Sequence, residues 1–405
     1  MKILHTADWH LGKNLEGNSR IEEQKRFLQE FIQMAENQAV DLVLIAGDVY
    51  DQVNPPHTAE KLLYDTLKKL TNGGKRLVVL IAGNHDSPER LVAARPLAQD
   101  HGIIMVGTPR TVVDVGEYGQ HKVVQSAEGM IEVEINGENA VILAVPYPSE
   151  KRLNEVLYHD MADDEEKLQS YNDRIQLLFK TLEQYYREDT INLVVTHLFS
   201  YGTKKEDTER SIELGGAYIL DSKCFPEQAQ YIAMGHVHKP QVIPGSDGRA
   251  RYSGSPIHYN KTETAHEKKC LFVEVAAGSD AIITEISVPV YKPIEVWKCK
   301  SIDEAFRMCE AKKEESSWVY LEIESDRTIR ENEIKEMKAL KSDILSIRLN
   351  IEGEKEEEVE VAQDLSFEEL FKLFYKEQKN VEPDQELLGL LYSIMEGDDD
   401  ETNLS

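Results

Sequence analysis

The sequence contains little that would suit a secreted or membrane-bound protein. It has only four cysteines among 405 residues, none close to another along the chain: Cys224, Cys270, Cys299 and Cys309. A disulfide framework needs paired cysteines, so we expect free thiols in a reducing cytosol. No apolar run is long enough to cross a membrane, and the first residues enter a strand-like segment rather than a signal peptide. These absences predict a cytoplasmic protein with no membrane contact.

Two further absences narrow the possibilities. No Walker A string is present, so the sequence does not predict that this chain itself hydrolyses ATP. No internal repeat is visible, and a chain of 405 residues is long enough for more than one globular domain.

The sequence does contain five short apolar runs, each followed by Asp, Asn or His. The runs are rich in Val, Ile and Leu, as is typical of buried parallel strands. They cover residues Lys2 to Ala7, Val40 to Ala46, Leu77 to Ala82, Ile191 to Val195 and Tyr231 to Met234. The motifs that follow them are Asp8-Trp9-His10, Gly47-Asp48-Val49-Tyr50-Asp51, Gly83-Asn84-His85-Asp86, Thr196-His197 and Gly235-His236-Val237-His238. Because ligands gather at the carboxyl ends of strands in α/β sheets, we expect these motifs to converge.

The residue types in these motifs indicate a site for two divalent metal ions. Carboxylates, imidazoles and one amide suit a hard or borderline ion such as Mn²⁺, with Mg²⁺ as the alternative. The candidate ligands are Asp8, His10, Asp48, Asn84, His197, His236 and His238. If Asp48 is shared, each ion receives four protein ligands and keeps room for a water and a phosphate oxygen. No cysteine lies inside the motifs, which argues against a structural zinc site.

The order of the motifs resembles that of the calcineurin-like metallophosphoesterases. Longer strings resemble the SbcD family, the nuclease subunits of bacterial complexes that repair double-strand breaks. These strings are HTADWHLGKN, GDVYD followed by Pro55-Pro56, AGNHDS, and RYSGSPI from Arg251 to Ile257. The resemblance covers residues 1–290 strongly and the remainder weakly. It implies an α/β fold in which two sheets form a sandwich.

The resemblance also implies a role for each motif residue. One ion would be held by Asp8, His10, Asp48 and His238, and the other by Asp48, Asn84, His197 and His236. His85 matches the catalytic histidine of the family, which contacts the substrate phosphate and assists the leaving group. Asp86 would orient that histidine. Asp51 stands where archaeal and eukaryotic relatives usually carry a second histidine, and it is either a helper of the site or a turn residue.

The activity implied is that of a DNA nuclease. It would be a 3′–5′ exonuclease on duplex ends and an endonuclease on single strands or hairpins, cleaving phosphodiesters by in-line attack of a metal-activated water. The family acts in DNA repair, recombination and replication with an SbcC-type coiled-coil ABC ATPase, as a homodimer within a heterotetramer near the nucleoid. The residues themselves leave the digestion polarity and the preferred DNA end open.

Two alternatives belong to other classes. The first is a metallophosphoesterase that acts on nucleotides or phosphoproteins. Phosphoprotein phosphatases usually carry Arg after GDxxD and an Asn-His-Glu motif, whereas this chain has Gln52 and Asn84-His85-Asp86. The second is a scaffold that binds metal without catalysis, which the presence of every expected ligand and of His85 disfavours.

The charge of the chain is unusual for a protein that binds DNA. It has 46 basic and 74 acidic residues, a net charge of −28, and residues 351–405 contribute half of the excess with 18 acidic and 4 basic residues. No broad basic face is visible, so DNA contact would rely on local groups or on a partner. The candidates are Lys13, Arg20, Arg90, Lys204, Lys205, Arg210 and Arg251, although a solvated charge is the commoner role for each.

We predict five regions along the chain: a nuclease domain (1–285), a small α+β capping domain (290–350), an acidic linker (351–363), a helical partner-binding segment (364–397) and a disordered tail (398–405). Periodicity predicts helices at Arg20–Asn37, Thr58–Leu70 and Glu165–Tyr186, and strands near Cys270–Val275 and Ala281–Val288. In the capping domain it predicts Ile294–Lys298, Trp318–Glu324 and Ile344–Leu349 as strands, with Ile302–Lys313 and Glu331–Lys341 as helices. Two amphipathic C-terminal helices would bind the ATPase through Phe367, Leu370, Phe371, Phe374, Leu387, Leu391 and Ile394.

Overall fold

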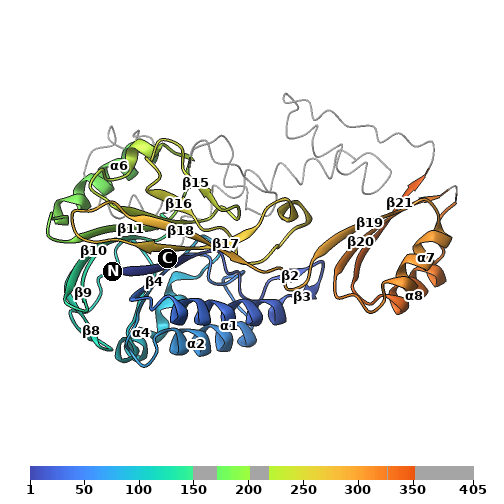
Figure 1. The fold of residues 1–405 in the computed structure, drawn as a ribbon, viewed down its shortest axis with the longest axis horizontal. Helices are drawn as coiled ribbons and strands as arrows, with labels where there is room; N and C mark the ends of the chain where they lie inside the picture. Colours follow the sequence, from blue (N-terminus) through green and yellow to red (C-terminus); the bar gives the residue numbers. More distant parts are fainter. Residues whose placement is uncertain (149–170, 201–218, 326, 352–405) are drawn as a thin grey trace, which may run out of the picture. The chain divides into compact units, whose positions relative to one another are not determined.

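The first of two large β-sheets carries the amino-terminal motifs. The structure is a computed structural model that describes residues 1–148, 171–200, 219–325 and 327–351 (Figure 1). This sheet has six strands in the order β18-β17-β1-β4-β5-β6. They are β1 (Lys2–Thr6), β4 (Leu42–Ala46), β5 (Leu77–Ile81), β6 (Ile103–Val106), β17 (Lys268–Glu274) and β18 (Ile282–Val288). Strands β1, β4, β5 and β6 are parallel, whereas β17 and β18 pair antiparallel.

The second sheet carries the later motifs and has eight strands in the order β15-β16-β14-β11-β10-β9-β8-β7. They are β7 (Gly116–Tyr118), β8 (His121–Ala127), β9 (Met130–Ile135), β10 (Glu138–Val145), β11 (Ile191–His197), β14 (Tyr231–Gly235), β15 (Gln241–Val242) and β16 (Ala250–Tyr252). Its centre, β10-β11-β14-β16, is parallel. The inner faces of the two sheets form one apolar core, to which both contribute fully buried residues such as Leu44, Ile81, Ile142 and Leu193.

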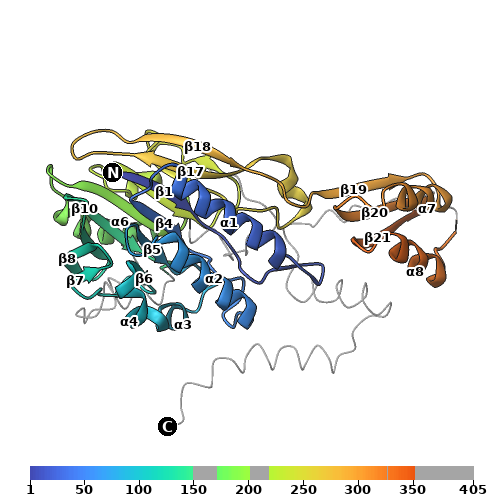
Figure 2. The same cartoon turned by 60° about the horizontal axis from the view of Figure 1, so that its bottom comes forward.

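Helices cover the outer faces of the sandwich. Helices α1 (Ile21–Asn37) and α2 (His57–Leu70) lie side by side on the six-stranded sheet (Figure 2). The inner stripe of α1 repeats at helical spacing and buries Phe27, Leu28 and Phe31. Helix α6 (Tyr171–Leu182) packs on the eight-stranded sheet.

Short elements connect these layers. They are the hairpin β2 (Asn14–Leu15) and β3 (Asn18–Ser19); the turns α3 (Pro88–Leu91), η1 (Val92–Ala94), α4 (Arg95–Ala98) and η2 (Gln99–His101); η4 (Glu183–Tyr185); the pair β12 (Phe199–Ser200) and β13 (Ile219–Leu220); and the 3₁₀ turns η5 (Ser222–Cys224) and η6 (Lys261–Ala265).

A smaller module follows the sandwich. It consists of β19 (Ile294–Cys299), α7 (Ile302–Ala311), β20 (Trp318–Ser325), α8 (Glu331–Leu340) and β21 (Ile344–Ile351), and its strands form one sheet in the order β19-β20-β21. The module has its own apolar core, with Cys309, Leu321 and Met337 fully buried. Trp318 also touches the sandwich, because its Nε1 donates a hydrogen bond to Glu23 Oε1 over 2.8 Å.

The elements predicted for the sandwich and the module are confirmed where the structure describes them. The five motif-bearing strands end within two residues of their predicted bounds. The helix predicted at Glu165–Tyr186 is described only from residue 171, as α6 followed by η4. The two C-terminal helices, the acidic linker beyond Ile351 and the tail lie outside the described residues, as do Lys204, Lys205 and Arg210. Ile351, predicted to open the linker, is the last residue of β21. The five-region division itself stays a prediction. In the part of the chain that is described, no helix is both long and apolar enough to cross a membrane.

Candidate metal centre

All five motifs meet at the carboxyl ends of the parallel strands. The first sheet supplies the residues that follow β1, β4 and β5, and the second supplies those at the ends of β11 and β14. Hydrogen bonds join the two sets: the backbone N–H of His236 donates to Asp8 Oδ1 over 2.9 Å, and His197 Nδ1 lies 2.8 Å from the Ala46 carbonyl oxygen. The predicted convergence of the motifs is therefore confirmed.

One group of side chains gathers around His10 and His238. Their Nε2 atoms are 3.0 Å apart, and His10 Nε2 lies 3.6 Å from Asp48 Oδ2. Asp8, His10 and His238 each offer a ligand atom within 4.8 Å of the others, and all three side chains are buried. Two imidazole nitrogens and carboxylate oxygens at this spacing can hold one divalent ion.

A second group gathers around Asn84. Its Oδ1 lies 3.0 Å from both His197 Nε2 and His236 Nδ1. His197 Nε2 is also 3.4 Å from Asp48 Oδ2, the same oxygen that faces His10 in the first group. Asp48 thus stands between the two groups, in the position that a shared ligand would need.

The backbone at several of these positions is strained. Asp8, His10, Asp48 and His236 have φ values of 54°, 43°, 48° and 102°, a region that non-glycine residues rarely adopt. Such conformations persist only where the surrounding structure imposes them, and they cluster at functional sites. Here they occur in the loops that follow β1, β4 and β14.

Glycines allow the loops of the two sheets to approach this closely. A Cβ on Gly235 would collide with the Ala46 carbonyl oxygen, and one on Gly83 would collide with the Asp48 carboxylate. A Cβ on Gly47 would likewise collide with the His197 ring. Close packing therefore explains the Gly that precedes the ligand-type residue in GDxxD, GNHD and GHxH.

The electrostatics of the cluster fit a cation. Burial would raise the pKa of Asp48, but His197 and His10 hold it well below its usual value. Burial would lower the pKa of His197, yet Asp48 raises it to about 9. Burial raises the pKa of Asp8 to about 6, and among the described residues its Oδ2 has no hydrogen-bond partner. An unsatisfied buried carboxylate oxygen is costly unless a ligand completes it, so the donor set fits divalent metal.

His85 lies next to the first group. Its ring meets that of His10 edge-on at 4.7 Å, and its Nδ1 lies 2.8 Å from the backbone oxygen of Asp51. The backbone N–H of His85 donates a hydrogen bond to Asp48 Oδ1 over 2.9 Å. The prediction that Asp86 orients this ring is corrected. The Asp86 carboxylate instead accepts hydrogen bonds from the backbone N–H groups of Gly83, Val49 and Tyr50, at 2.8–3.1 Å. These hydrogen bonds satisfy the buried carboxylate and join the loop after β4 to the loop after β5.

Asp51 contacts the candidate site through its side chain. Its Oδ1 accepts a hydrogen bond from Lys13 Nζ over 2.7 Å and lies 3.4 Å from His10 Nδ1. Burial opposes ionisation, but His10 and Lys13 together lower the pKa of Asp51.

A second layer of buried polar residues, which the sequence did not predict, contacts the candidate ligands. Glu263 Oε1 lies 3.0 Å from His238 Nδ1, and Lys268 Nζ lies 2.6 Å from Glu263 Oε2. Gln24 Nε2 donates to the His10 carbonyl oxygen over 2.8 Å and to the Tyr259 hydroxyl over 3.1 Å. None of these residues follows the carboxyl end of a strand, where the motifs lie. The one signal nearby was the string from Arg251 to Ile257, which leads into this segment.

The structure contradicts one of the predicted DNA contacts. Arg20 is buried, and its guanidinium donates hydrogen bonds to both carboxylate oxygens of Glu23 and to the His258 carbonyl oxygen at 2.5–2.7 Å, so the prediction for Arg20 was wrong. Lys13 sits beside the site but is paired with Asp51. Arg90 is partly exposed and paired with Glu60.

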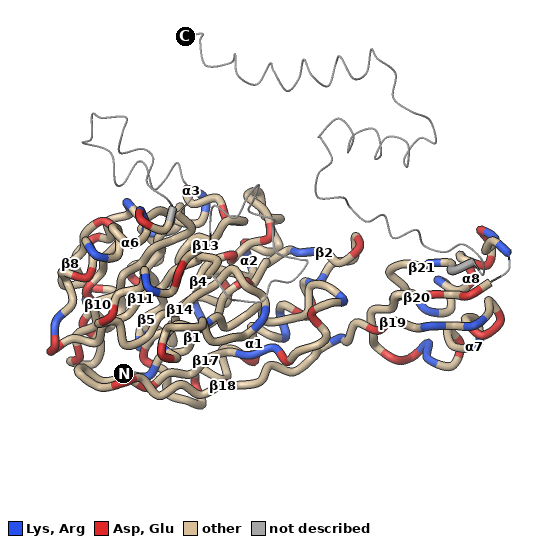
Figure 3. The backbone as a smooth tube through the Cα atoms, turned by 90° about the horizontal axis from the view of Figure 1, so that it is seen from above, with Lys and Arg blue, Asp and Glu red and all other residues tan. Residues whose placement is uncertain are grey.

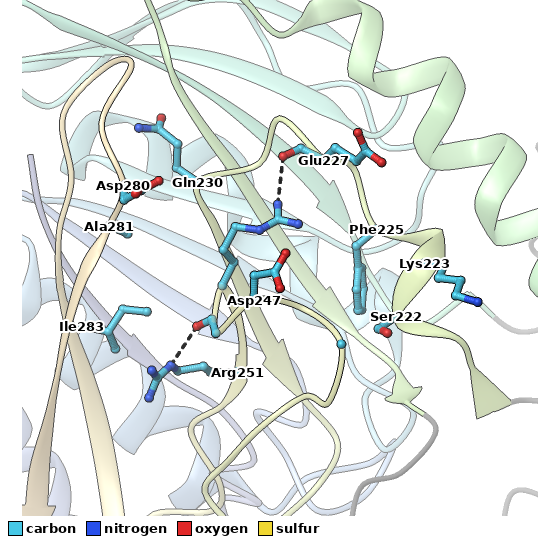
Figure 4. Close-up of a pocket in the computed structure, with 13 residues that line it drawn as sticks. Ser222, Lys223, Phe225, Glu227, Gln230, Asp247, Arg251, Asp280, Ala281 and Ile283 are labelled. Carbon is cyan, nitrogen blue, oxygen red and sulfur yellow. Dashed lines mark hydrogen bonds between the residues drawn. The ribbon is translucent and has the colours of Figure 1, made fainter.

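Arg251 lines a cavity of about 750 Å³ together with Lys223, Asp247, Asp280 and Ile283 (Figure 4). None of the candidate metal ligands lines this cavity, and Arg251 Nε donates to the Gly248 carbonyl oxygen over 3.1 Å. Basic and acidic residues are interspersed along the described backbone (Figure 3).

Comparisons with known proteins agree with this geometry. The family model described as calcineurin-like phosphoesterase matches residues 1–240. The model described as type 5 capsule protein repressor C-terminal domain matches residues 290–379. The chain is 36% identical over 405 residues to the SbcD subunit of the nuclease SbcCD from Bacillus subtilis (strain 168), covering 99% of both chains.

Two solved structures are more distant. An archaeal phosphodiesterase aligns with a TM-score of 0.30 and 11% identity, over 71% of this chain and 100% of its own. A dimetal phosphatase from Danio rerio aligns with a TM-score of 0.34 and 14% identity, over 71% of this chain and 99% of its own. The family models and the full-length relative decide the question: this chain belongs to the SbcD family of calcineurin-like phosphoesterases.

Proposed function

We propose that this protein is a metal-dependent DNA nuclease that hydrolyses phosphodiesters. The observation that carries the proposal is the pair of ligand groups that share Asp48 Oδ2, with His85 beside them. Asp8, His10, Asp48 and His238 would hold one ion, and Asp48, Asn84, His197 and His236 the other. When bound, two divalent ions activate a water and stabilise the attacking and leaving oxygens of an in-line displacement. Manganese is the ion we propose, with magnesium as the alternative.

The protein's own residues would position the substrate phosphate and protonate the leaving oxygen. His85 would contact the phosphate and give a proton to the leaving oxygen, and the Asp51 carbonyl oxygen would fix its ring, since Nδ1 lies 2.8 Å from it. Lys13, beside the site, would contact the DNA backbone. Cleavage would serve DNA repair, recombination and replication in the cytoplasm, close to the nucleoid.

The direct test is digestion of end-labelled DNA. Duplex and hairpin substrates are incubated with the protein in Mn²⁺ or Mg²⁺, with and without the ATPase partner. We expect 3′–5′ shortening of duplex ends and opening of hairpins, faster in Mn²⁺. Intact DNA under all conditions would refute nuclease function.

The alternative, a phosphatase acting on nucleotides or phosphoproteins, predicts a different substrate preference. Bis-p-nitrophenyl phosphate, a diester, is compared with p-nitrophenyl phosphate, a monoester, in the same buffer with Mn²⁺. A nuclease hydrolyses the diester faster, whereas faster hydrolysis of the monoester would favour the alternative.

We further propose that residues 364–397 bind an SbcC-type ABC ATPase. The support is the amphipathic pattern of that segment and the name of the relative, which is part of a two-component complex. A chain ending at residue 350 should keep diester cleavage in Mn²⁺ but lose ATP-dependent processing of duplex ends. Phe371→Glu should mimic the truncation in a pull-down with the ATPase, and a melting curve on the same sample checks that the chain is folded. Normal binding by Phe371→Glu would contradict this role.

The nuclease would act as a homodimer within a heterotetramer with that ATPase. We propose that the two copies meet at a groove of about 450 Å³ between α2 and α4, which is lined mainly by apolar side chains, among them Tyr64, Leu67, Leu97 and Met105. Leu97 is 76% exposed, so Leu97→Glu should not disturb folding. In sedimentation, Leu97→Glu should give monomers and the exposed control Val242→Glu should give wild-type dimers. A dimer of Leu97→Glu would place the contact elsewhere.

A further inference from the structure

The imidazole of His238 is held from behind by a buried carboxylate. Its Nδ1 lies 3.0 Å from Glu263 Oε1, while its Nε2 faces His10. Glu263 is fully buried and fixed in place, because its Oε2 also accepts hydrogen bonds from Ser255 Oγ at 3.2 Å and from the Tyr259 N–H at 3.1 Å. A carboxylate at Nδ1 keeps the proton on that nitrogen and leaves Nε2 free to bind metal.

A buried lysine completes this arrangement. Lys268 comes from β17 of the six-stranded sheet, and its Nζ lies 2.6 Å from Glu263 Oε2, 2.8 Å from Ser255 Oγ and 3.1 Å from the His238 carbonyl oxygen. Lys268 therefore balances the charge of Glu263 and also donates a hydrogen bond to the backbone of His238, the candidate ligand. Buried ion pairs rarely improve stability over apolar residues, so a fully satisfied one behind a candidate ligand points to a role at the site.

His10 has a looser form of this arrangement. Its Nδ1 makes no hydrogen bond among the described residues but lies 3.4 Å from Asp51 Oδ1, and Lys13 Nζ lies 2.7 Å from the same oxygen. Each imidazole of the first ligand group therefore has a carboxylate near its Nδ1, and that carboxylate pairs with a lysine.

The second ligand group is built differently. His197 Nδ1 faces a neutral acceptor, the Ala46 carbonyl oxygen, at 2.8 Å. His236 turns its Nδ1 toward Asn84 Oδ1 at 3.0 Å, and Asn84 is an uncharged amide. A neutral carbonyl polarises an imidazole less than a carboxylate does, and an amide attracts a cation less than a carboxylate does.

We propose that the two metal positions are unequal: Glu263–Lys268 and Asp51–Lys13 position His238 and His10 so that the Asp8–His10–His238 position binds the first, tighter ion. The Asn84–His197–His236 position then binds the second, more exchangeable ion. This inference rests on the proposed metal-dependent function, and Glu263 and Lys268 act in it as positioning residues that do not touch the substrate.

Calorimetric titration of the metal-free, full-length protein with Mn²⁺ tests the proposal. The wild type should show two binding events of different affinity. Glu263→Gln should weaken the tighter event by about 10- to 100-fold and change the weaker one less. Glu285→Gln is the matched control, because Glu285 also pairs with a lysine, Lys269, over 2.6 Å but lies on exposed β18. The control should bind as the wild type does.

A second variant separates positioning from folding. Glu263→Gln leaves Lys268 buried without a counterion, which lowers stability by itself. The double variant Glu263→Gln/Lys268→Met removes both charges, so its melting temperature should recover toward the wild-type value while the tighter event stays weak. If the double variant regained wild-type affinity, the pair would be structural only and the proposal would be overturned.

The position of the tighter ion is tested in an Asn84→Ala background. One binding event should remain there, and adding Glu263→Gln should weaken it. An unchanged Kd would overturn the assignment, as would equal weakening of both events in the Glu263→Gln single variant. Failure of the proposed nuclease function would look different, because both Mn²⁺ events would be intact while DNA stayed uncleaved.

Discussion

The two sheets of the sandwich make different contributions to the candidate site. The six-stranded sheet supplies all the oxygen ligands, Asp8, Asp48 and Asn84, and one imidazole, His10. The eight-stranded sheet supplies imidazoles alone, from His197, His236 and His238. Neither sheet could hold either proposed ion by itself. The site therefore depends on how the two sheets pack against each other, as well as on the motifs.

This dependence has a thermodynamic consequence. Ions that bind only the packed sandwich stabilise it, by about 2.7 kcal/mol when the free ion is at 100 times its Kd. Conversely, any change that lets the sheets shift should weaken ion binding even if no ligand is altered. The following predictions test that link, from the largest expected effect to the smallest.

Removing the shared ligand should have the largest effect. Asp48 Oδ2 faces His10 at 3.6 Å and His197 at 3.4 Å, so Asp48→Asn removes a charge from both ligand groups. We expect calorimetry to show loss of both Mn²⁺ events and cleavage of diesters to fall by more than about 1,000-fold. Asn84→Ala is the comparison and should lose only one event. Two intact events in Asp48→Asn would rule out the shared role.

Substituting the histidine beside the proposed metals should slow DNA cleavage without weakening the binding of Mn²⁺ or DNA. His85 contributes no ligand in the proposed set, so His85→Gln should keep both Mn²⁺ events and its affinity for DNA. Its cleavage rate should fall by about 10²- to 10⁴-fold, the usual contribution of a general acid. Single-turnover digestion of labelled duplex gives the rate. A near-wild-type rate would show that His85 has no catalytic role.

The pH dependence of metal binding should follow His197. In the metal-free protein, burial opposes its ionisation, but Asp48 raises the pKa of His197 to about 9, so we expect this imidazole to carry a proton at neutral pH. A metal ion must displace that proton, and affinity should therefore increase between pH 6.5 and pH 8.5, by at most about tenfold per pH unit. Calorimetry in buffers of different ionisation enthalpy should detect proton release. Affinity that is flat over this range would contradict the expected protonation.

Loosening the interface between the sheets should have the smallest effect on metal affinity. Leu44 is fully buried between the sheets, whereas Leu63 belongs to α2 and is fully buried against the outer face of the six-stranded sheet. Each Leu→Ala change should lower the free energy of unfolding by about 2–5 kcal/mol. Only Leu44→Ala should also weaken Mn²⁺ binding, by a few-fold. Equal Mn²⁺ affinity in the two variants would indicate that the ligand loops hold the site independently of sheet packing.

Much of this arrangement could be predicted from the sequence. Short Val-, Ile- and Leu-rich runs that end on Asp, Asn or His specify both the strands and the side of the sheet on which ligands gather. The seven ligand-type residues do lie together, and the elements of the module from β19 to β21 follow their predicted order.

The rest depends on contacts between residues far apart in the chain. Arg20 looked like a surface charge, but its pairing with Glu23 and with a carbonyl oxygen 238 positions away buries it. Asp86 adjoins His85 in sequence, yet its carboxylate serves the backbone of another loop. Glu263 and Lys268 stand outside every motif, and they reach His238 because η6 and β17 pack beside the loop after β14.

The most direct measurement is anomalous diffraction from crystals grown with Mn²⁺. Two manganese peaks roughly 3.5–4 Å apart should appear on either side of Asp48, one among Asp8, His10 and His238 and one among Asn84, His197 and His236. A single peak, or peaks away from these residues, would contradict a two-metal site assembled from both sheets.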